Sequence, residues 1–393
     1  MTKRPDASLR APWPSSISRP VVNPLQPSVV YASGDPDQLD AQYEGEAKGF
    51  TYAREGHPNA EVLAGILDRM EGGAGGIVTS SGMGAVTVAL LALAKAGDHV
   101  LGADQLYGRS LRLMTEVLPN LGIATSVADP TDLGAFEAAI RPETSLILIE
   151  TVSNPTLRVA DVLGIIELAK KRNIRVAVDN TFPTPRGFNP LKSGADVVIH
   201  SVTKLLAGHS DATLGYVAAT DRTLSDQMSV LSATMGFTAS PFDCWLAERG
   251  LYSFDLRYER STSNAEMLAD ALASMPGVRR VLYPTRQDHP DHNRSVSMLN
   301  GEGGHMVSFE IDGGRSETNA FVRAARGLNF APTLGDIATT ISHPPTSSHR
   351  ALTVEARAAI GISEGFFRIS VGCEEIEILI NSFEEALKVA FEA

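Results

Sequence analysis

Two side chains with reactive chemistry follow apolar runs that are typical of buried strands. Asp179 comes directly after Ile174–Val178, and Lys204 follows Val197–His200 in the segment HSVTKLLAGHSD. A carboxylate at the end of a strand can pair with a protonated heterocycle nitrogen, and a lysine amine can form a Schiff base with a carbonyl group. The commoner roles are a turn or helix cap for Asp179 and a surface charge for Lys204. One helical crossover separates the strand before Asp179 from the strand before Lys204, so the two residues can lie on neighbouring loops of the same site.

The glycine-rich segment GGAGGIVTSSGMGAVTVALL contains a candidate anion site. It lacks the G-x-G-x-x-G pattern of dinucleotide-binding loops, and no lysine follows a G-x-x-x-x-G pattern. It predicts a strand, the turn Ser80–Gly84 and an apolar helix, an arrangement that directs backbone N–H groups at an anion. We expect a phosphate there, with an ordinary tight turn as the alternative.

Three further polar residues fit the same site. Tyr107 in GADQLYGRS could stack on a flat ring and carry protons, and Asn154 in ETVSNPT could donate to a ring substituent. Arg368 in FFRISVG lies among apolar residues, so it needs either a substrate carboxylate or an intraprotein salt bridge. A core tyrosine and a loop-capping asparagine are the plainer alternatives. The order of these features along the chain is that of pyridoxal-5′-phosphate (PLP) enzymes of the aminotransferase type: a site for an anion, a ring that can stack, a carboxylate for a ring nitrogen and a lysine amine.

Composition narrows the class of protein. The 393 residues are 43% hydrophobic and 20% charged, as in a globular chain long enough for two domains. A formal charge of −12 argues against nucleic acid or an anionic membrane as the main partner, although it leaves small anions open. Two cysteines and a polar, proline-broken N-terminus predict a cytoplasmic protein without disulfides or a signal peptide. We expect no metal site and no membrane span, since the longest apolar stretch is only Val86–Ala94.

Strands and helices alternate between residues 60 and 220. The expected strands are Gly76–Thr79, His99–Leu101, Ile123–Val127, Leu146–Ile149, Ile174–Val178, Val197–His200 and Gly215–Ala218. The expected helices are Ala60–Met70, Ala85–Lys95, Ser110–Leu118, Leu133–Ile140 and Val162–Lys171. This alternation predicts an α/β fold with a mostly parallel sheet of seven strands, covered on both faces.

The ends of the chain differ from this central part. Residues 1–55 lack a sustained period and predict an extended arm. A helical stretch, Pro241–Ala273, follows the sheet, and strands at Met306–Ile311 and Phe367–Ser370 with helices at Ser316–Ala325 and Ile376–Phe391 predict a smaller α+β unit. We therefore expect an arm over 1–55, a cofactor-binding large domain over 56–245 and a small domain over 246–393.

The chain resembles the Cys/Met metabolism (trans-sulfuration) family of PLP enzymes. The likeness runs from about residue 24 to the end, in the order and spacing of TSSGMGA, DQLYG, ETVSNPT, VDNTF, HSVTKLLAGHSD, SPFDCWLAERG and FRISVGCEE. The segments VDNTF and HSVTK are the most specific of these. The resemblance implies fold type I, the fold of PLP-dependent aminotransferases, with PLP as cofactor.

The resemblance also implies roles for individual residues. Lys204 would be the Schiff-base lysine, Asp179 the partner of the pyridine nitrogen and Arg368 the site of the substrate α-carboxylate. Tyr107 would stack on the ring, and Thr333 stands where the family usually has serine. The remaining implied cofactor contacts are Ser81, Gly82, Met83, Asn154, Thr181, Ser201 and Thr203. Tyr52 and Arg54 match a pair that reaches the phosphate of a neighbouring subunit, which implies a dimer at least and commonly a tetramer.

The substrate end departs from the family pattern. Arg112 matches a position that can hold a distal carboxylate, whereas Arg109 replaces a small residue or cysteine. Thr51 and Ala338 stand where relatives carry glutamates that recognise a distal amine. The missing carboxylates argue against tight recognition of the far ammonium of cystathionine.

The implied reaction is γ-elimination on a sulfur-containing or otherwise γ-substituted L-amino acid, which gives a 2-oxo acid and ammonia. The alternatives are γ-replacement on an O-acylhomoserine, β-elimination, or loss of a non-sulfur group such as that of canavanine. A scaffold that kept the fold without turnover is a fourth possibility, because a fold does not fix a function.

Overall fold

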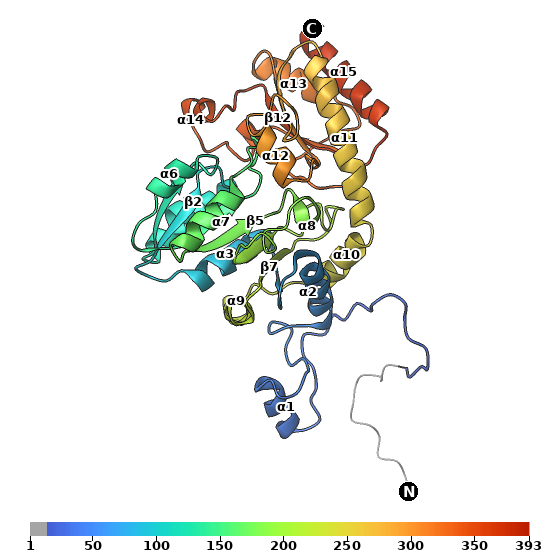
Figure 1. The fold of residues 1–393 in the computed structure, drawn as a ribbon. Helices are drawn as coiled ribbons and strands as arrows, with labels where there is room; N and C mark the ends of the chain where they lie inside the picture. Colours follow the sequence, from blue (N-terminus) through green and yellow to red (C-terminus); the bar gives the residue numbers. More distant parts are fainter. Residues whose placement is uncertain (1–13, 393) are drawn as a thin grey trace.

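The computed structural model describes residues 14–392, which fold around two sheets (Figure 1). The larger sheet has seven strands in the order β1-β7-β6-β5-β4-β2-β3. These are β1 (Ile77–Thr79), β2 (His99–Ala103), β3 (Ala124–Ala128), β4 (Thr144–Glu150), β5 (Arg175–Asp179), β6 (Val197–His200) and β7 (Gly215–Ala219). Strand β7 is antiparallel to both its neighbours, and the other pairs are parallel. The prediction of a mostly parallel, seven-stranded sheet is confirmed.

Helices cover both faces of this sheet, which explains why its strands consist of nearly continuous apolar residues. They are α2 (Pro58–Glu71), α3 (Gly82–Leu93), α6 (Leu133–Ala138), α7 (Val162–Lys171), α8 (Thr184–Gly187), α9 (Arg222–Met235) and α10 (Pro241–Leu251). Residues of α3 and α7 share one buried cluster with the sheet, and residues of α2 and α10 share another.

The segment that follows β2 is less regular than predicted. In place of one helix over Ser110–Leu118, the chain forms α4 (Gly108–Arg112), the π-helical turn η1 (Leu113–Val117) and α5 (Leu118–Asn120). Pro119 lacks the N–H group that would donate to a carbonyl oxygen one α-helical turn earlier. The π-helical turn η1, which is wider than an α-helical turn, lies just before it.

The smaller sheet lies in the C-terminal part and has the order β10-β11-β12-β9-β8. Its strands are β8 (Val278–Leu282), β9 (Met306–Ile311), β10 (Asn329–Phe330), β11 (Thr340–Ser342) and β12 (Phe366–Ser370). The accompanying helices are α12 (His292–Met298), α13 (Arg315–Ala324), the 3₁₀ turn η2 (Pro344–Thr346), α14 (Val354–Ala359) and α15 (Ile376–Glu392). The rings of Phe309, Phe321, Phe367 and Phe383 pack together in its core. The predicted α+β unit is confirmed, while its boundary at residue 246 stays a prediction.

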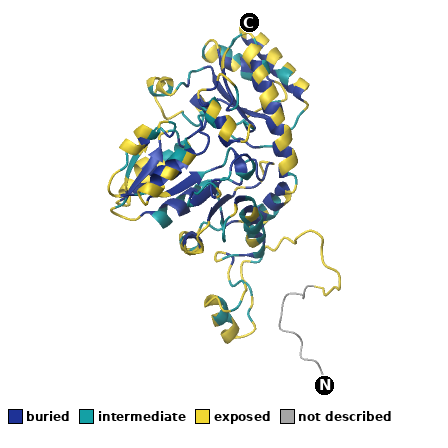
Figure 2. Cartoon of the chain, viewed as in Figure 1, coloured by how far each residue is buried: buried dark blue, intermediate teal, exposed yellow. Residues whose placement is uncertain are grey.

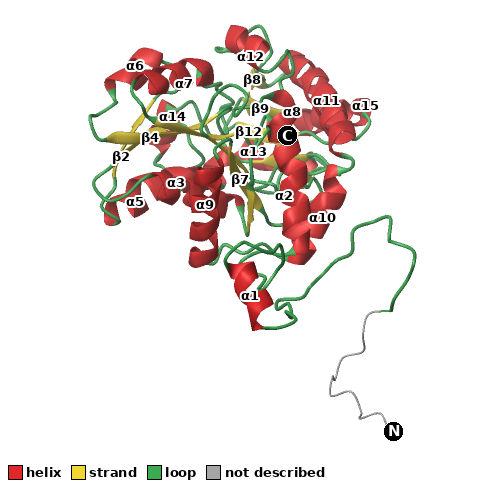
Figure 3. Ribbon diagram, turned by 60° about the horizontal axis from the view of Figure 1, so that its bottom comes forward, coloured by secondary structure: helices red, strands yellow, loops and turns green. Residues whose placement is uncertain are grey.

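One long helix joins the two units. The predicted stretch Pro241–Ala273 forms two helices, α10 and α11 (Phe254–Ser274). Phe254 and Tyr258, near the start of α11, pack in a core of the larger sheet, whereas Ala265 and Leu272 pack in the core of the smaller one. Helix α11 therefore runs along both units, as Figures 1 and 3 show.

The N-terminal arm extends away from this body and is largely exposed (Figure 2). The expectation of an arm without regular structure is wrong at α1 (Pro36–Tyr43), a helix in which no residue is buried. It forms because Asp35 caps the N–H of Gln38 and Pro36 occupies the first turn. Residues 1–13, on which the prediction of no signal peptide rests, lie outside the described residues. No helix within residues 14–392 is long and apolar enough to cross a membrane.

Arg257 ties α11 to the turn that follows Lys204. Its buried guanidinium donates to the carbonyl oxygens of Leu205 at 2.7 Å, Leu206 at 3.1 Å and Gly250 at 2.8 Å. A planar guanidinium with several N–H donors is suited to hold three carbonyl groups at once. Arg257 therefore fixes the backbone on the C-terminal side of Lys204.

We expect Arg257→Met to destabilise the protein by roughly 3 kcal/mol, because it leaves buried carbonyl oxygens without donors. Thermal unfolding and PLP content of the purified protein measure the effect. Arg260→Met is the matched control, since Arg260 is exposed on the same helix and bonds Glu374 and Glu375 at the surface. Equal midpoints for the two variants would show that Arg257 does not hold this turn.

Candidate active site

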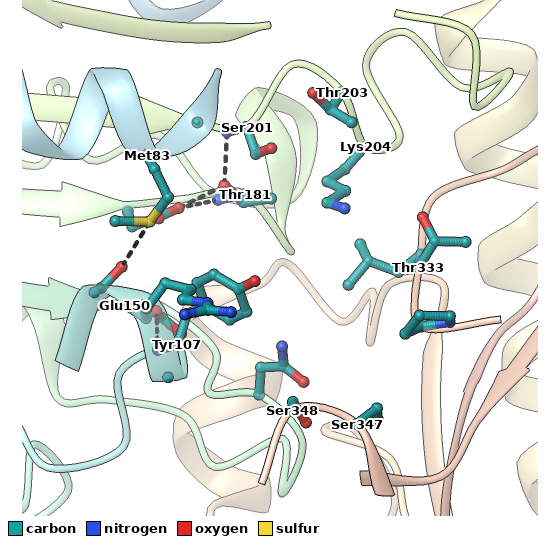
Figure 4. A pocket seen from close by; sticks show the side chains of 18 of the residues that line it. Met83, Tyr107, Glu150, Thr181, Ser201, Thr203, Lys204, Thr333, Ser347 and Ser348 are labelled. Carbon is teal, nitrogen blue, oxygen red and sulfur yellow. Dashed lines mark hydrogen bonds between the residues drawn. The ribbon is translucent and has the colours of Figure 1, made fainter. Parts of the chain in front are cut away.

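A cavity of about 870 Å³ opens where the carboxyl ends of β4 and β5 face segments of the C-terminal unit (Figure 4). Most of the predicted site residues line it: Ser81, Gly82, Met83, Tyr107, Arg109, Arg112, Asn154, Asp179, Thr181, Ser201, Thr203, Lys204, Thr333 and Arg368. In the view of Figure 4, Lys204 reaches into the space between Tyr107 and Thr333. The fold thus gathers residues that are far apart in the sequence.

Asp179 ends β5 with one carboxylate oxygen already engaged. Its Oδ1 accepts from the Thr181 N–H at 3.0 Å and from the Thr181 hydroxyl at 2.5 Å, and that hydroxyl oxygen accepts the Ser201 N–H at 2.9 Å. Burial raises the pKa of Asp179, because an ionised carboxylate is costly in a site of low polarity, and the two bonds from Thr181 oppose this shift. The Oδ2 atom has no hydrogen-bond partner among residues 14–392, so it is available to a cation.

Lys204 lies on the turn after β6 and is only partly exposed. Burial lowers the pKa of its amine, and the positive charge of Arg368 lowers it further. A lysine amine with a lowered pKa reaches its neutral, nucleophilic form at a lower pH than an exposed one.

The N-terminus of α3 forms a narrow cradle against Ser201. Ser81 caps α3 by accepting the Gly84 N–H at 3.1 Å, and Gly82 and Met83, whose N–H groups have no partner within the helix, line the cavity. A Cβ atom on Gly82 would lie 2.8 Å from the Cβ and Oγ atoms of Ser201, so only glycine fits. Thr203 also lines the cavity, but its hydroxyl donates to the carbonyl oxygen of Leu214.

Arg368 on β12 reaches the cavity from the C-terminal unit. Its Nη1 donates to Asn154 Oδ1 at 2.7 Å and its Nη2 donates to the Thr333 carbonyl oxygen at 2.8 Å, whereas its buried Nε has no partner in the described chain. No carboxylate within residues 14–392 pairs with it, so the alternative of an intraprotein salt bridge is wrong there. Burial lowers its pKa to about 10, and the nearby Tyr107 opposes this shift.

Comparison with known proteins agrees with this arrangement. The sequence model of the Cys/Met metabolism PLP-dependent enzymes matches residues 14–388. The chain belongs to that family. It is 38% identical to cystathionine beta-lyase of Bacillus subtilis (strain 168) over 87% of each chain, and 37% identical to L-methionine gamma-lyase of Pseudomonas putida over 89% of this chain and 88% of that one. A crystal structure of cystathionine gamma synthase from Xanthomonas oryzae pv. oryzae superposes with a TM-score of 0.88 at 37% identity, covering 94% of this chain and 93% of that one.

The cofactor of the family is PLP, and the residues of the cavity fit it. PLP, when bound, supplies a protonated pyridine ring that takes up negative charge from an amino-acid substrate. We propose that Lys204 holds the cofactor covalently, that Asp179 Oδ2 holds the proton of the ring nitrogen, and that the cradle of Gly82, Met83 and Ser201 holds the phosphate. Two observations support this fit: the free Oδ2 atom of Asp179 and the space beside Ser201 that a Cβ on Gly82 would fill.

Two predicted cofactor contacts do not reach the cavity of their own chain. Tyr52 and Arg54 are exposed; the Arg54 guanidinium lies over the Tyr52 ring and pairs with Glu55 at 2.9 Å. Thr51 and Ala338 are likewise not among the residues that line it. The proposed role of Tyr52 and Arg54 therefore depends on a neighbouring subunit.

Sequence reasoning missed Glu150 and Arg350, which also line the cavity. Glu150 ends β4 in register with Asp179, and its Oε1 accepts the Tyr107 N–H at 2.5 Å, which fixes the residue expected to stack on the ring. Burial and the adjacent Asp179 raise the pKa of Glu150 well above its usual range. Glu150 could have been predicted from the sequence, because it lies at the carboxyl end of a predicted strand, as Asp179 does. Arg350 lies in an irregular segment, which gives no such signal.

We expect Gly82→Ala to weaken PLP binding roughly tenfold or more, because the added methyl group forces Ser201 away from the N-terminus of α3. Titration of PLP-free protein with PLP, followed by fluorescence, measures this affinity. Gly84→Ala is the control on the same helix, since its Cβ would lie 3.4 Å from Thr79 in ordinary contact. Unchanged affinity in Gly82→Ala would rule out this cradle.

The lowered pKa of Lys204 predicts a pH dependence that needs no turnover. In PLP-free protein, competitive acetylation followed by mass spectrometry should show Lys204 reaching half-maximal reactivity at a lower pH than an ordinary lysine. Arg368→Gln should move that midpoint to higher pH, because it removes the nearby positive charge. Arg222→Gln, which removes a surface arginine paired with Asp226, should leave it in place. A midpoint that falls or stays fixed in Arg368→Gln would contradict the assigned cause.

Proposed function

We propose that this family member catalyses γ-elimination on a γ-substituted L-amino acid. The overall reaction consumes one water and gives a 2-oxo acid, ammonia and the protonated leaving group, with no external oxidant or reductant. The observation that carries the proposal is the convergence of Lys204, Tyr107 and Arg368 on one cavity beside Asp179. These supply two groups able to move protons, one group for the substrate carboxylate and one for the cofactor nitrogen.

Arg368 would fix the substrate at its α-carboxylate. The guanidinium is buried, charged and paired only with the neutral oxygens of Asn154 and Thr333 within residues 14–392, so its charge is not compensated there. Its free Nε atom offers a further donor. A carboxylate that is held at this point would place the α-carbon in the cavity near the Lys204 side chain.

Lys204 and Tyr107 would carry the protons. The Lys204 amine, neutral at lower pH than usual, would take the proton from the α-carbon. γ-Elimination also needs a proton taken from the β-carbon and one given to the leaving group at the γ-carbon. Tyr107, which the Glu150 carboxylate holds at the cavity wall, would serve beside Lys204 in these later transfers.

We further propose that a dimer is the smallest active unit and that two dimers form a tetramer. The exposed Tyr52 and Arg54 would contact the phosphate in a neighbouring subunit. Apolar side chains in the arm support this, since Ile17, Val21 and Val30 are exposed in the single chain and a partner would cover them. The cytoplasmic location stays a prediction.

The test is product analysis on purified protein with L-methionine, L-cystathionine, L-cysteine, O-acetyl- and O-succinyl-L-homoserine and L-canavanine. Each substrate is supplied with and without a thiol. We expect 2-oxobutanoate and ammonia from a γ-substituted substrate without thiol, and a loss of at least about 10³-fold in Lys204→Ala, which removes the proton carrier.

Other products would replace the proposal. A thioether that forms only with thiol would establish γ-replacement, and pyruvate from cystathionine would establish β-elimination. A visible cofactor band in Lys204→Ala without added amine would show that another residue holds PLP.

A further inference from the structure

We propose that Arg109 and Arg350 form an anion subsite at the mouth of the cavity, which selects substrates whose γ-substituent ends in a carboxylate or phosphate. The inference rests on the proposed function in that the substrate enters with its α-carboxylate at Arg368. It specifies the chemical group at the far end of the γ-substituent, which the proposed γ-elimination does not determine.

The two arginines come from segments that touch across the cavity mouth. Arg109 lies on α4, directly after Gly108, and Arg350 lies two residues past Ser348 in the segment that follows η2. A Cβ atom on Gly108 would lie 3.3 Å from the carbonyl oxygen of Ser348, so the two backbones are in close contact. Both arginine side chains are exposed and line the cavity.

The same segments lie beside the proposed substrate carboxylate. Burial lowers the pKa of His349, which directly precedes Arg350, and the charge of Arg368 lowers it further; Arg368 also interacts with Tyr107, two residues before Arg109. Arg109 and Arg350 line the same cavity as Arg368, which would anchor the α-carboxylate. A γ-substituent that extends from there toward the opening would meet them.

Both guanidinium groups are uncompensated. Neither Arg109 nor Arg350 has a side-chain hydrogen bond or ion pair anywhere in residues 14–392. Arg112, which the family resemblance favoured for a distal carboxylate, differs, because its Nε pairs with Glu116 at 2.7 Å. The structure therefore favours Arg109 and Arg350 over Arg112.

The charges that line the cavity favour an anion and disfavour a distal ammonium. Four arginines line it against two carboxylates, although the whole chain has a formal charge of −12. Both carboxylates, Glu150 and Asp179, lie at the strand ends, where Asp179 would face the cofactor nitrogen and Glu150 already accepts the Tyr107 N–H. Within residues 14–392, neither carboxylate of the cavity wall pairs with Arg109 or Arg350.

Two hydroxyl groups at this end of the cavity are already engaged: the Ser347 hydroxyl donates to the His343 carbonyl oxygen at 2.8 Å, and Ser348 Oγ lies 2.9 Å from His349 Nδ1. Ser347 and Ser348 line the cavity at the end opposite to Ser201 and Thr203 in the view of Figure 4. The side chains proposed for the phosphate of PLP are on the other side, so that phosphate does not occupy the two arginines. The two guanidinium groups are therefore the donors that remain for carboxylate or phosphate oxygens.

The test compares O-succinyl-L-homoserine, which ends in a carboxylate, with the neutral O-acetyl-L-homoserine on the PLP-loaded protein. Consumption of each ester is followed, so that elimination and replacement are counted alike. We expect a higher kcat/KM for the succinyl ester. Arg109→Gln and Arg350→Gln should each lower it about tenfold, while the value for the acetyl ester changes less than about threefold. O-Phospho-L-homoserine in a parallel assay distinguishes a phosphate from a carboxylate.

Arg222→Gln is the control for net charge, since it removes one exposed arginine on α9. Equal losses on both esters would assign Arg109 and Arg350 to packing and overturn the subsite. A loss of succinyl preference in Arg112→Gln, with both other variants unchanged, would move the subsite to Arg112 and also overturn it.

A binding measurement keeps this inference separate from the proposed function. Calorimetric titration of the PLP-loaded protein with azelate, whose two carboxylates are as many atoms apart as those of O-succinyl-L-homoserine and which has no leaving group, needs no turnover. We expect azelate to bind more tightly than nonanoate, and the double variant Arg109→Gln with Arg350→Gln to lose about tenfold or more of that affinity. If azelate binds no better than nonanoate, the subsite is refuted even where γ-elimination is observed. If the subsite binds azelate but no ester is consumed, only the proposed reaction fails.

Discussion

The parallel register of β4, β5 and β6 is the constraint on which the site depends. It aligns Glu150 with Asp179 and Asp179 with Ile199, so the carboxyl ends of three strands meet at one edge of the sheet. Because residues after parallel strands emerge on the same side, Asp179, Ser201 and Lys204 reach one cavity although they are separated in sequence. The Thr181 hydroxyl links two of these strand ends, since it donates to Asp179 and accepts from the Ser201 backbone.

The cavity is completed from the C-terminal unit. Arg368 enters from β12, and α11 fixes the turn after Lys204 through the three carbonyl oxygens that Arg257 holds. A Cβ atom on Gly335 would lie 2.3 Å from the Leu205 backbone nitrogen, so the segment that carries Thr333 packs directly against the lysine turn. The two units therefore contribute to one site, and a shift of either would separate the amine from the group that holds the substrate carboxylate.

Charge is distributed in the cavity by depth. Two carboxylates lie at the sheet edge, where burial raises the pKa of both and a cationic ring nitrogen would compensate one of them. Arg109 and Arg350 are exposed and have no side-chain partner in the described chain, whereas Arg368 is buried. A substrate with an anion at each end would therefore meet a buried arginine with its α-carboxylate and exposed arginines with its distal group. Since relatives of nearly equal identity are named for β-elimination, γ-elimination and γ-synthesis, such local differences are where the specificity of this member must be sought.

The sequence by itself determined the α/β class, the mostly parallel sheet and the family, because buried strands are runs of apolar residues and because VDNTF and HSVTK combine reactive residues at fixed spacing. It also singled out Asp179 and Lys204, since strand ends can be recognised locally. Only the tertiary structure decided which arginine near Tyr107 has no ion pair within residues 14–392. Arg112 pairs with Glu116 one helical turn away, whereas Arg109 has none, and the adjacent Gly108 packs against Ser348, over 200 residues later in the chain. The short helix α1 depends on a local cap and a proline, both of which stand in the sequence. Glu150 and Arg257 instead act through contacts with distant backbone atoms, which are set by the packing of the folded chain and which periodicity and residue type do not encode.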